Sequence, residues 1–282
     1  EEPMNAKAKL FSYDQIDTPI HRLSGLTKLI CFLLLTFALM YSYDIRVILV
    51  MVVFAFGIMR VSKIKFSQIR LMVIYVIIFI LTNAIISFFF NPEMGPELYG
   101  TYHPISKLYG RYYLTKEQVL YGITKMVKYA SVIPFGIIFF LTTNPSEFAS
   151  SLNRVGVPYK ASYAVALTLR YFPDVQRDYQ DISLAQQARG LELSRKASLK
   201  SRVKNGLLII IPLIFSSLDR IELISNAMDL RGFGKSKTRT WYSSRKMTRG
   251  DYVAIGISLL IFIATVSVSI FINKSRFYNP FV

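Results

Sequence analysis

The amino-acid sequence predicts an all-α integral membrane protein with about five transmembrane helices and a further helical domain outside the membrane. Two uninterrupted runs carry this prediction, because residues 71–90 and 252–272 contain no charged side chain. Each run is long enough to cross roughly 30 Å of hydrocarbon as an α-helix. The composition agrees: 52% of the residues are hydrophobic, whereas soluble domains have about 45–50% apolar residues.

Five membrane segments can be placed along the chain. They are predicted at residues 26–43, 47–59, 71–90, 119–143 and 252–272. The second segment is short, so it either thins the bilayer locally or forms a tight hairpin with the first. Lys125 and Lys128 interrupt the start of the fourth segment, and we expect their side chains to snorkel toward the headgroup region.

The distribution of Lys and Arg predicts the orientation of these segments. The net charge of +17 would suggest nucleic-acid binding in a soluble protein, but in a membrane protein basic residues mark cytoplasmic loops. Residues 144–250 carry 18 Lys and Arg against 8 Asp and Glu. We therefore expect a multi-pass membrane protein with a cytoplasmic N-terminus and an extracellular C-terminus. The predicted parts are an arm with four helices (1–143), a cytoplasmic helical domain (144–250) and a last helix (251–282).

The predicted cytoplasmic domain has helical patterns. Pro145 and Ser146 begin a short helix that ends at Gly156. Residues 161–190 predict one or two long amphipathic helices, with Pro173 as a kink or a break. Residues 199–232 predict another helix, in which the stretch 207–215 is apolar on every side. This stretch is too short to span a membrane, so we expect a buried helix or, alternatively, a re-entrant or interfacial segment.

Two helix ends in this domain share one pattern. Arg189-Gly190 ends the stretch LAQQARG, and Arg231-Gly232 ends NAMDLRG, 42 residues later. Aligned at the arginines, Ile182, Ser183 and Ala185 also match Ile224, Ser225 and Ala227. One such end is an ordinary helix C-cap, but two similar ends suggest two equivalent receptors. Arginine suits that role because its planar guanidinium pairs with a carboxylate through two hydrogen bonds.

These residues give the chain a family resemblance. It resembles the transmembrane coupling (T) component of energy-coupling factor transporters, the EcfT family, whose complexes are vitamin and micronutrient importers of the ATP-binding-cassette superfamily. The resemblance covers nearly the whole chain and rests on DTPIHRLSGLTKL near the start, on the number of segments, and above all on QARGL and DLRGF. It implies a protein of the bacterial plasma membrane with two long crossing coupling helices within residues 144–250. It also implies a subunit that is not an enzyme and needs no cofactor or metal.

The resemblance also implies partners and contact residues. Two ATPase subunits, of the EcfA and EcfA′ type, would hydrolyse ATP and bind the two arginine motifs, namely Ala188, Arg189 and Gly190, and Leu230, Arg231 and Gly232. Leu230 departs from the small residue that is common there. A membrane S component that binds the substrate would contact the apolar stretch at Leu207, Leu208, Ile211, Pro212 and Phe215. The lipid bilayer is the remaining expected partner, and nucleic acid is not expected.

Two other functions were weighed. A membrane-embedded lipid- or prenyl-modifying enzyme needs clustered acids or a His and Cys constellation. Asp174, Asp178 and Asp181 lie at helical spacing, but nearby arginines favour a salt-bridged helix face. GFGKSKT lacks the first glycine of a phosphate-binding loop. A self-contained permease needs charges within its membrane segments, and residues 71–90 and 252–272 contain none. Asn83 is the one notable polar side chain, for which we expect a packing hydrogen bond.

Overall fold

The computed structural model describes residues 18–64, 66–109, 112–191, 198–236, 240–242 and 244–280. Asp17, the first residue of DTPIHRLSGLTKL, lies outside these residues. The chain divides into two compact units. The first unit comprises Glu1–Asn144 with Arg245–Val282, and the second unit comprises Pro145–Ser244.

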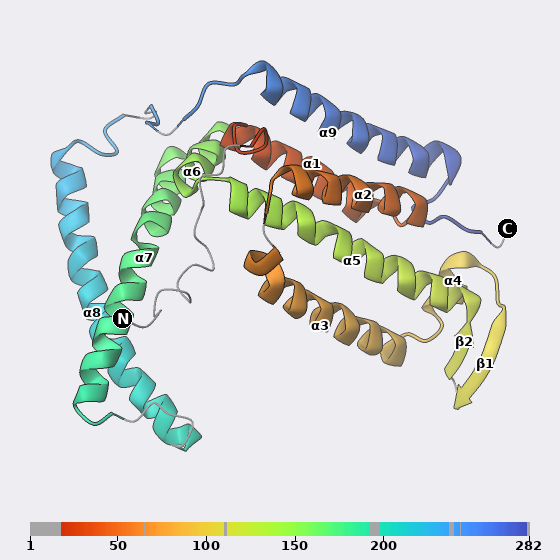
Figure 1. Cartoon of the computed structure of the whole chain (residues 1–282), viewed down its shortest axis with the longest axis horizontal. Coiled ribbons are helices and arrows are strands. Elements are labelled where there is room, and N and C mark those ends of the chain that lie inside the picture. The colour runs from red at the N-terminus through yellow and green to blue at the C-terminus, as the bar shows by residue number, and fades with distance from the viewer. Residues whose placement is uncertain are drawn as a thin grey trace. The chain divides into compact units, whose positions relative to one another are not determined.

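Five apolar helices build the first unit (Figure 1). They are α1 (Gly25–Tyr41), α2 (Ile45–Val61), α3 (Phe66–Phe90), α5 (Lys116–Thr142) and α9 (Arg249–Ser267), which continues as the π-helix η1 (Val268–Ile272). Three segments of the described chain are long and apolar enough to cross a membrane: Met72–Phe90, Lys116–Thr142 and Arg249–Ile272. The 17 residues of α1 and of α2 each span about 25 Å. The chain is therefore an all-α integral membrane protein, as predicted.

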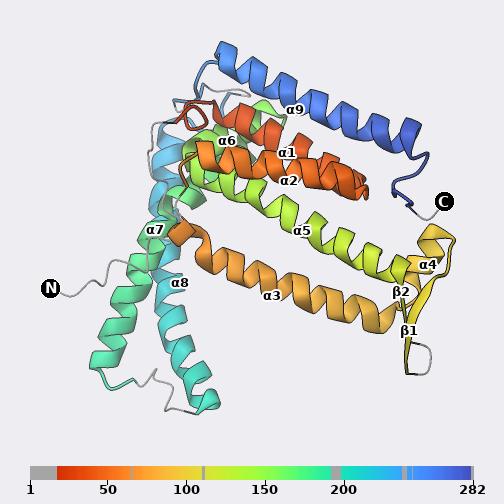
Figure 2. The same ribbon diagram turned by 45° about the vertical axis from the view of Figure 1, so that its right-hand side comes forward.

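Each predicted membrane segment coincides with one of these helices. The short second segment is a hairpin partner of the first, because Ser42, Tyr43 and Asp44 alone connect α1 to α2. Side chains of α1, α2 and α5 form the buried core between them. Its members are Leu35, Ala38 and Leu39 of α1, Ile48, Met51 and Ala55 of α2, and Phe135 of α5. Around this core, α9 packs along α1, and α3 packs along α5 (Figures 1 and 2).

Two lysines connect α1 and α5 at both ends. The Nζ of Lys28 on α1 donates to the carbonyl of Thr142, the last residue of α5, at 2.6 Å. The Nζ of Lys128 on α5 donates to the carbonyl of Met40, in the last turn of α1, at 2.7 Å. It also lies 3.2 Å from the ring centroid of Tyr43. Because Lys128 is 1% exposed, our expectation that it snorkels to the headgroups is wrong: the end of a neighbouring helix binds it instead.

Asp251 connects the starts of α1 and α9. Its Oδ1 accepts from the backbone N–H of Ser24 at 2.8 Å, and its Oδ2 accepts from the N–H and the hydroxyl of Thr248 at 2.7 and 2.8 Å. Ser24 itself caps α1, since its hydroxyl accepts from the N–H of Thr27. A fully buried carboxylate is tolerated here because three donors surround it.

The segment between α3 and α5 has structure that the sequence did not lead us to expect. It contains the short helix α4 (Met94–Tyr99) and the antiparallel hairpin of β1 (Pro104–Tyr109) and β2 (Tyr112–Thr115). Glu117, in the first turn of α5, accepts hydrogen bonds from Thr101 and from the backbone N–H of His103, and its carboxylate lies 2.6 Å from Nδ1 of the same His103. These contacts hold the connection between α4 and the hairpin against the start of α5.

The chain after η1 packs against the α1–α2 connection. The backbone N–H of Tyr43 donates to the carbonyl of Arg276 at 2.8 Å, and the Tyr43 and Phe277 rings stack. Asp44 accepts from Arg46 and from Asn273. The end of η1, the α1–α2 connection and α4 thus gather at one end of the bundle, since Asn279 also donates to the Tyr99 carbonyl.

The described residues of the second unit form the helices α6 (Pro145–Arg154), α7 (Tyr159–Ala188) and α8 (Leu199–Leu230). The short helix begins at Pro145 as predicted. The predicted stretch 161–190 contains one helix and not two, because α7 continues through Pro173 and ends at Ala188. Pro212 likewise lies inside α8. A proline in a helix removes one backbone hydrogen bond but ends neither helix here.

The hydrogen bond from Lys128 to the end of α1 predicts that Lys128→Met destabilises the protein. The substitution keeps an apolar chain of similar length but removes the donor to the Met40 carbonyl and the cation near the end of α1. We expect a loss of about 1–2 kcal/mol in the free energy of unfolding, measured by thermal unfolding in detergent. Lys116→Met, at an exposed position of the same helix, is the matched control, and equal stability of the two variants would refute the role of Lys128.

The Asp44 contacts predict a pH dependence. Burial raises the pKa of Asp44, but the hydrogen bonds from Arg46 and Asn273 and the charge of Arg46 outweigh it, so the pKa is lowered. The stabilisation is therefore complete above the unfolded-state pKa of about 3.9 and is lost as the pH falls through the lower folded-state pKa. We expect Asp44→Asn to cost about 1–2 kcal/mol at neutral pH. The variant should approach wild-type stability only as the pH falls below about 3.9 and through the lower folded-state pKa. A pH-independent difference in thermal unfolding would contradict this.

Candidate functional site

The two long helices of the second unit lie side by side and cross (Figures 1 and 2). Arg220 of α8 donates to the carboxylate of Asp178 on α7 at 2.6 Å. Both side chains are largely covered, with 30% and 25% of their surfaces exposed. Charged hydrogen bonds of this length are stronger than neutral ones, so this pair fixes the contact between α7 and α8.

The ends of α7 and α8 have the same backbone geometry. Arg189 has φ −82° and ψ 9°, and Arg231 has φ −83° and ψ 8°. The following glycines have positive φ, +87° at Gly190 and +69° at Gly232. Such a conformation is strained for a residue with a Cβ, so glycine is needed at both positions. The sequence match between the two motifs is therefore also a structural match.

The same hydrogen bonds close both ends. The N–H of Gly190 donates to the carbonyl of Gln187, and the N–H of Leu191 donates to that of Gln186, at 2.9 and 3.0 Å. In α8, Gly232 and Phe233 donate to Asp229 and Met228, both at 2.9 Å. This is the Schellman arrangement, which satisfies the last carbonyls of a helix from within the chain. Each helix end is thus complete without an external partner.

The motif residues are presented at the surface of the second unit. Ala188, Arg189, Gly190, Leu230 and Arg231 are exposed and Gly232 is half-buried. Leu230 is 90% exposed, which is unusual for a large apolar side chain at a helix end. The end of α7 and the end of α8 lie at opposite ends of the crossed pair (Figures 1 and 2). The structure thus presents the two motifs in equivalent form but apart from each other.

An aromatic cluster that we did not predict holds the second motif. Phe233, directly after Gly232, lies against the rings of Tyr159 and Tyr163 with centroids 5.4 and 4.8 Å apart. Trp241 contacts the same two tyrosines, and its indole N–H donates to Asn153 of α6 at 3.1 Å. The spacing of Tyr159 and Tyr163, one helical turn, and the single tryptophan of the chain were the available signals. The cluster ties the end of α8 to the start of α7.

The apolar stretch of α8 differs from its prediction. Leu207, Leu208, Ile211 and Phe215 are 51%, 43%, 49% and 63% exposed, and Pro212 is half-buried. The prediction of a buried helix is therefore wrong. Within the stretch 207–215, only Ile209 is buried, at 1% exposed. The stretch is the middle of a long helix whose outer face is apolar and uncovered. Larger apolar patches of this kind mark contact surfaces for another protein or for lipid.

The acidic residues of α7 form ion pairs. Asp174 lies 3.7 Å from Arg177, which confirms the salt-bridged interpretation at this position. Asp178 instead pairs with Arg220 of α8, so it belongs to the contact between the two helices. Among the described residues, no group of three His, Cys, Asp or Glu side chains could hold a metal ion. Lys237 and Thr238 of GFGKSKT lie outside the described residues, and α8 rather than a strand precedes its first glycine.

Comparison with known proteins identifies the family of this chain. Residues 17–242 match the CbiQ family, described as cobalt transport protein. The chain is 31% identical to the energy-coupling factor transporter transmembrane protein EcfT of Leuconostoc gelidum over 196 residues, which cover 65% of this chain and 69% of that protein. It is 27% identical to EcfT of Bacillus selenitireducens (86% and 90% covered) and 23% identical to EcfT of Bacillus subtilis (87% and 91% covered).

Both comparisons extend over most of the chain. The resemblance drawn from the two arginine motifs is thereby confirmed. The chain belongs to the CbiQ/EcfT family and is a transmembrane component of an energy-coupling factor transporter.

Proposed function

We propose that this chain transmits the ATP-driven motion of two ATPase subunits to a membrane subunit that binds the substrate, a vitamin or another micronutrient. The observation that carries the proposal is the identical geometry of the two Arg-Gly helix ends. Two equivalent ends at opposite sides of one helix pair fit two equivalent receptors. ATP hydrolysis takes place in the ATPase subunits, so the chain itself is not an enzyme.

Each arginine motif docks in a groove of one ATPase subunit. The exposed guanidinium of Arg189 or Arg231 pairs there with a carboxylate. The Schellman caps support this role, because a helix end whose carbonyls are already bonded loses little by leaving water. In the described part of the chain, no atom other than those of its two neighbours lies within 4 Å of the position of a Cβ at Gly190, so the partner's backbone can approach closely.

The apolar face of α8 is the proposed contact for the substrate-binding subunit. Leu207, Leu208, Ile211 and Phe215 expose apolar surface on the helix that also carries Arg231. When the ATPase subunits close on each other, the ends of α7 and α8 move with them and the apolar face turns. The bound membrane subunit is thereby reoriented, and its substrate is released to the cytoplasm.

The positive charge of residues 144–250 supports a cytoplasmic position for this coupling domain. The same rule places the N-terminus in the cytoplasm and the C-terminus outside. The grouping of the α1–α2 connection, α4 and the end of η1 at one end of the bundle is compatible with this alternation. The proposal thus comprises a membrane part (1–143 and 251–282) and a cytoplasmic coupling domain (144–250).

The first prediction of this role concerns the ATPase subunits. In a co-expressed complex, Arg189→Glu with Arg231→Glu should release both subunits on purification, because each docking contact loses about 2–5 kcal/mol when a buried acid is left unpaired. Arg177→Glu, which makes the same charge change at an exposed site on α7, is the control. A stable double-variant complex with full uptake of substrate would disprove the docking role.

The second prediction concerns the apolar face. Ile211→Ser with Phe215→Ser should weaken binding of the substrate-binding subunit at least about tenfold, since each buried side chain of this size contributes about 1.5–3 kcal/mol. The ATPase subunits should remain bound, which co-purification and the subunit ratio report. Val203→Ser, at a 67% exposed position of the same helix, should have no effect. Retention of all subunits would place the contact elsewhere.

A further inference from the structure

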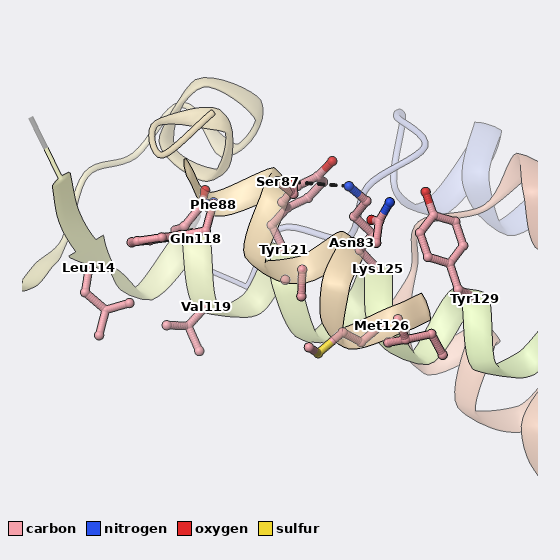
Figure 3. Close-up of a pocket in the computed structure, with 13 residues that line it drawn as sticks. Asn83, Ser87, Phe88, Leu114, Gln118, Val119, Tyr121, Lys125, Met126 and Tyr129 are labelled. Carbon is pink, nitrogen blue, oxygen red and sulfur yellow. Dashed lines mark hydrogen bonds between the residues drawn. The ribbon is translucent and has the colours of Figure 1, made fainter. Parts of the chain in front are cut away.

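A pocket of about 160 Å³ lies between α3 and α5 in the first unit (Figure 3). Its lining combines polar and apolar side chains. The polar ones include Asn83 and Ser87 of α3 and Gln118, Tyr121, Lys125 and Tyr129 of α5, and the apolar ones include Ile80, Val119 and Met126. No Asp or Glu is among the described lining residues. The pocket is thus amphiphilic and carries one positive charge.

The charge of Lys125 is not neutralised within the described chain. Its Nζ donates to the neutral hydroxyl of Ser87 at 3.1 Å, and the ring centroids of Tyr121 and Tyr129 are each 5.9 Å away. Among the described residues no carboxylate forms a salt bridge with it. A cation in a membrane segment is costly without an anionic counterpart. This lysine differs from Lys28 and Lys128, which each bind a carbonyl at a helix end.

Asn83 adds a second polar group. We expected it to make a packing hydrogen bond, but its side chain has none with any described residue, so that expectation is wrong. Figure 3 shows its amide pointing to the same side of the pocket as the Lys125 ammonium, whereas Val119 and Met126 lie on the other side. A ligand that fills the pocket therefore meets donors at one side and apolar surface at the other.

The pocket lies at the depth of a lipid headgroup. Ser87 precedes Phe90, the end of α3, by three residues, which is about 4.5 Å along the helix axis. Tyr112 packs on Phe88 and Phe89 at this level, and aromatic side chains gather at the membrane–water boundary. No residue of the Met72–Phe90 span is buried within the described chain, so the pocket can be reached from the bilayer.

We propose that this pocket binds the phosphate of one anionic phospholipid. Lys125 pairs with a phosphate oxygen, the Asn83 amide donates to another, and the glycerol and the first acyl carbons lie along Val119 and Met126. The volume is adequate for the phosphate group, since a cavity of about 150 Å³ holds a benzene-sized molecule. The lipid supplies the negative charge that the chain does not provide. This proposal is independent of the coupling role.

Native mass spectrometry of the full chain in detergent, titrated with dioleoylphosphatidylglycerol, tests the site. We expect one tightly bound lipid in the wild type and about tenfold weaker binding in Lys125→Gln, which corresponds to about 1.4 kcal/mol. Lys116→Gln removes a charge from an exposed position of the same helix and should bind like the wild type. Dioleoylphosphatidylcholine, whose headgroup has no net charge, should bind more weakly to the wild type.

Three results would overturn the proposal. One is equal binding of phosphatidylglycerol by Lys125→Gln and the wild type. Another is displacement of the lipid by millimolar inorganic phosphate, which would identify a site for a free anion. Thermal unfolding without added lipid shows whether Lys125→Gln folds. If it does not, Asn83→Leu tests the site instead, because this variant keeps the charge of Lys125 but fills the pocket. The third overturning result is unchanged lipid affinity in that variant.

Discussion

A backbone carbonyl at a helix end needs a donor, and inside a bilayer no water supplies one. The first unit depends on this constraint. Lys28 and Lys128 supply donors to the last turns of α5 and α1, where the negative end of a helix dipole favours a cation. A lysine within an apolar helix is tolerated because its partner is part of the protein. The remaining helices pack on this antiparallel pair, with α9 along α1 and with α2 and α3 along α5.

In the second unit, the carbonyls at the helix ends obtain their hydrogen bonds in the opposite way. The last carbonyls of α7 and α8 accept from N–H groups of the residues that follow them directly, so no other helix is needed to cap them. An end that is complete in itself can lie at the surface and present an arginine there. The glycine at positive φ is what makes this local solution possible. Helix ends hold the first unit together, whereas in the second unit each of these two ends is capped by its own chain.

Features that depend on neighbouring residues could be predicted from the sequence. The apolar runs gave the five helices of the first unit, and the Arg-Gly pairs gave both caps, since a Schellman cap involves only six consecutive residues. Features that depend on the packing of distant segments could not be predicted from the sequence. The burial of Lys128, the exposure of Ile211 and Phe215, and the contacts of Phe233 with Tyr159 and Tyr163 are set by segments distant in the sequence. The hairpin at 104–115 was missed because its short strands carry no strong alternation.

The ion pair between Asp178 and Arg220 also joins equivalent positions of the two motif-bearing helices, because these residues are 42 positions apart, as Arg189 and Arg231 are. Each arginine motif therefore lies eleven residues beyond the pair, about 16 Å along its helix. The ion pair at the crossing of the two helices is thus equally far from both arginine motifs. In the proposed coupling, equal displacements of the two ATPase subunits would rotate α7 and α8 symmetrically and leave the crossing point in place.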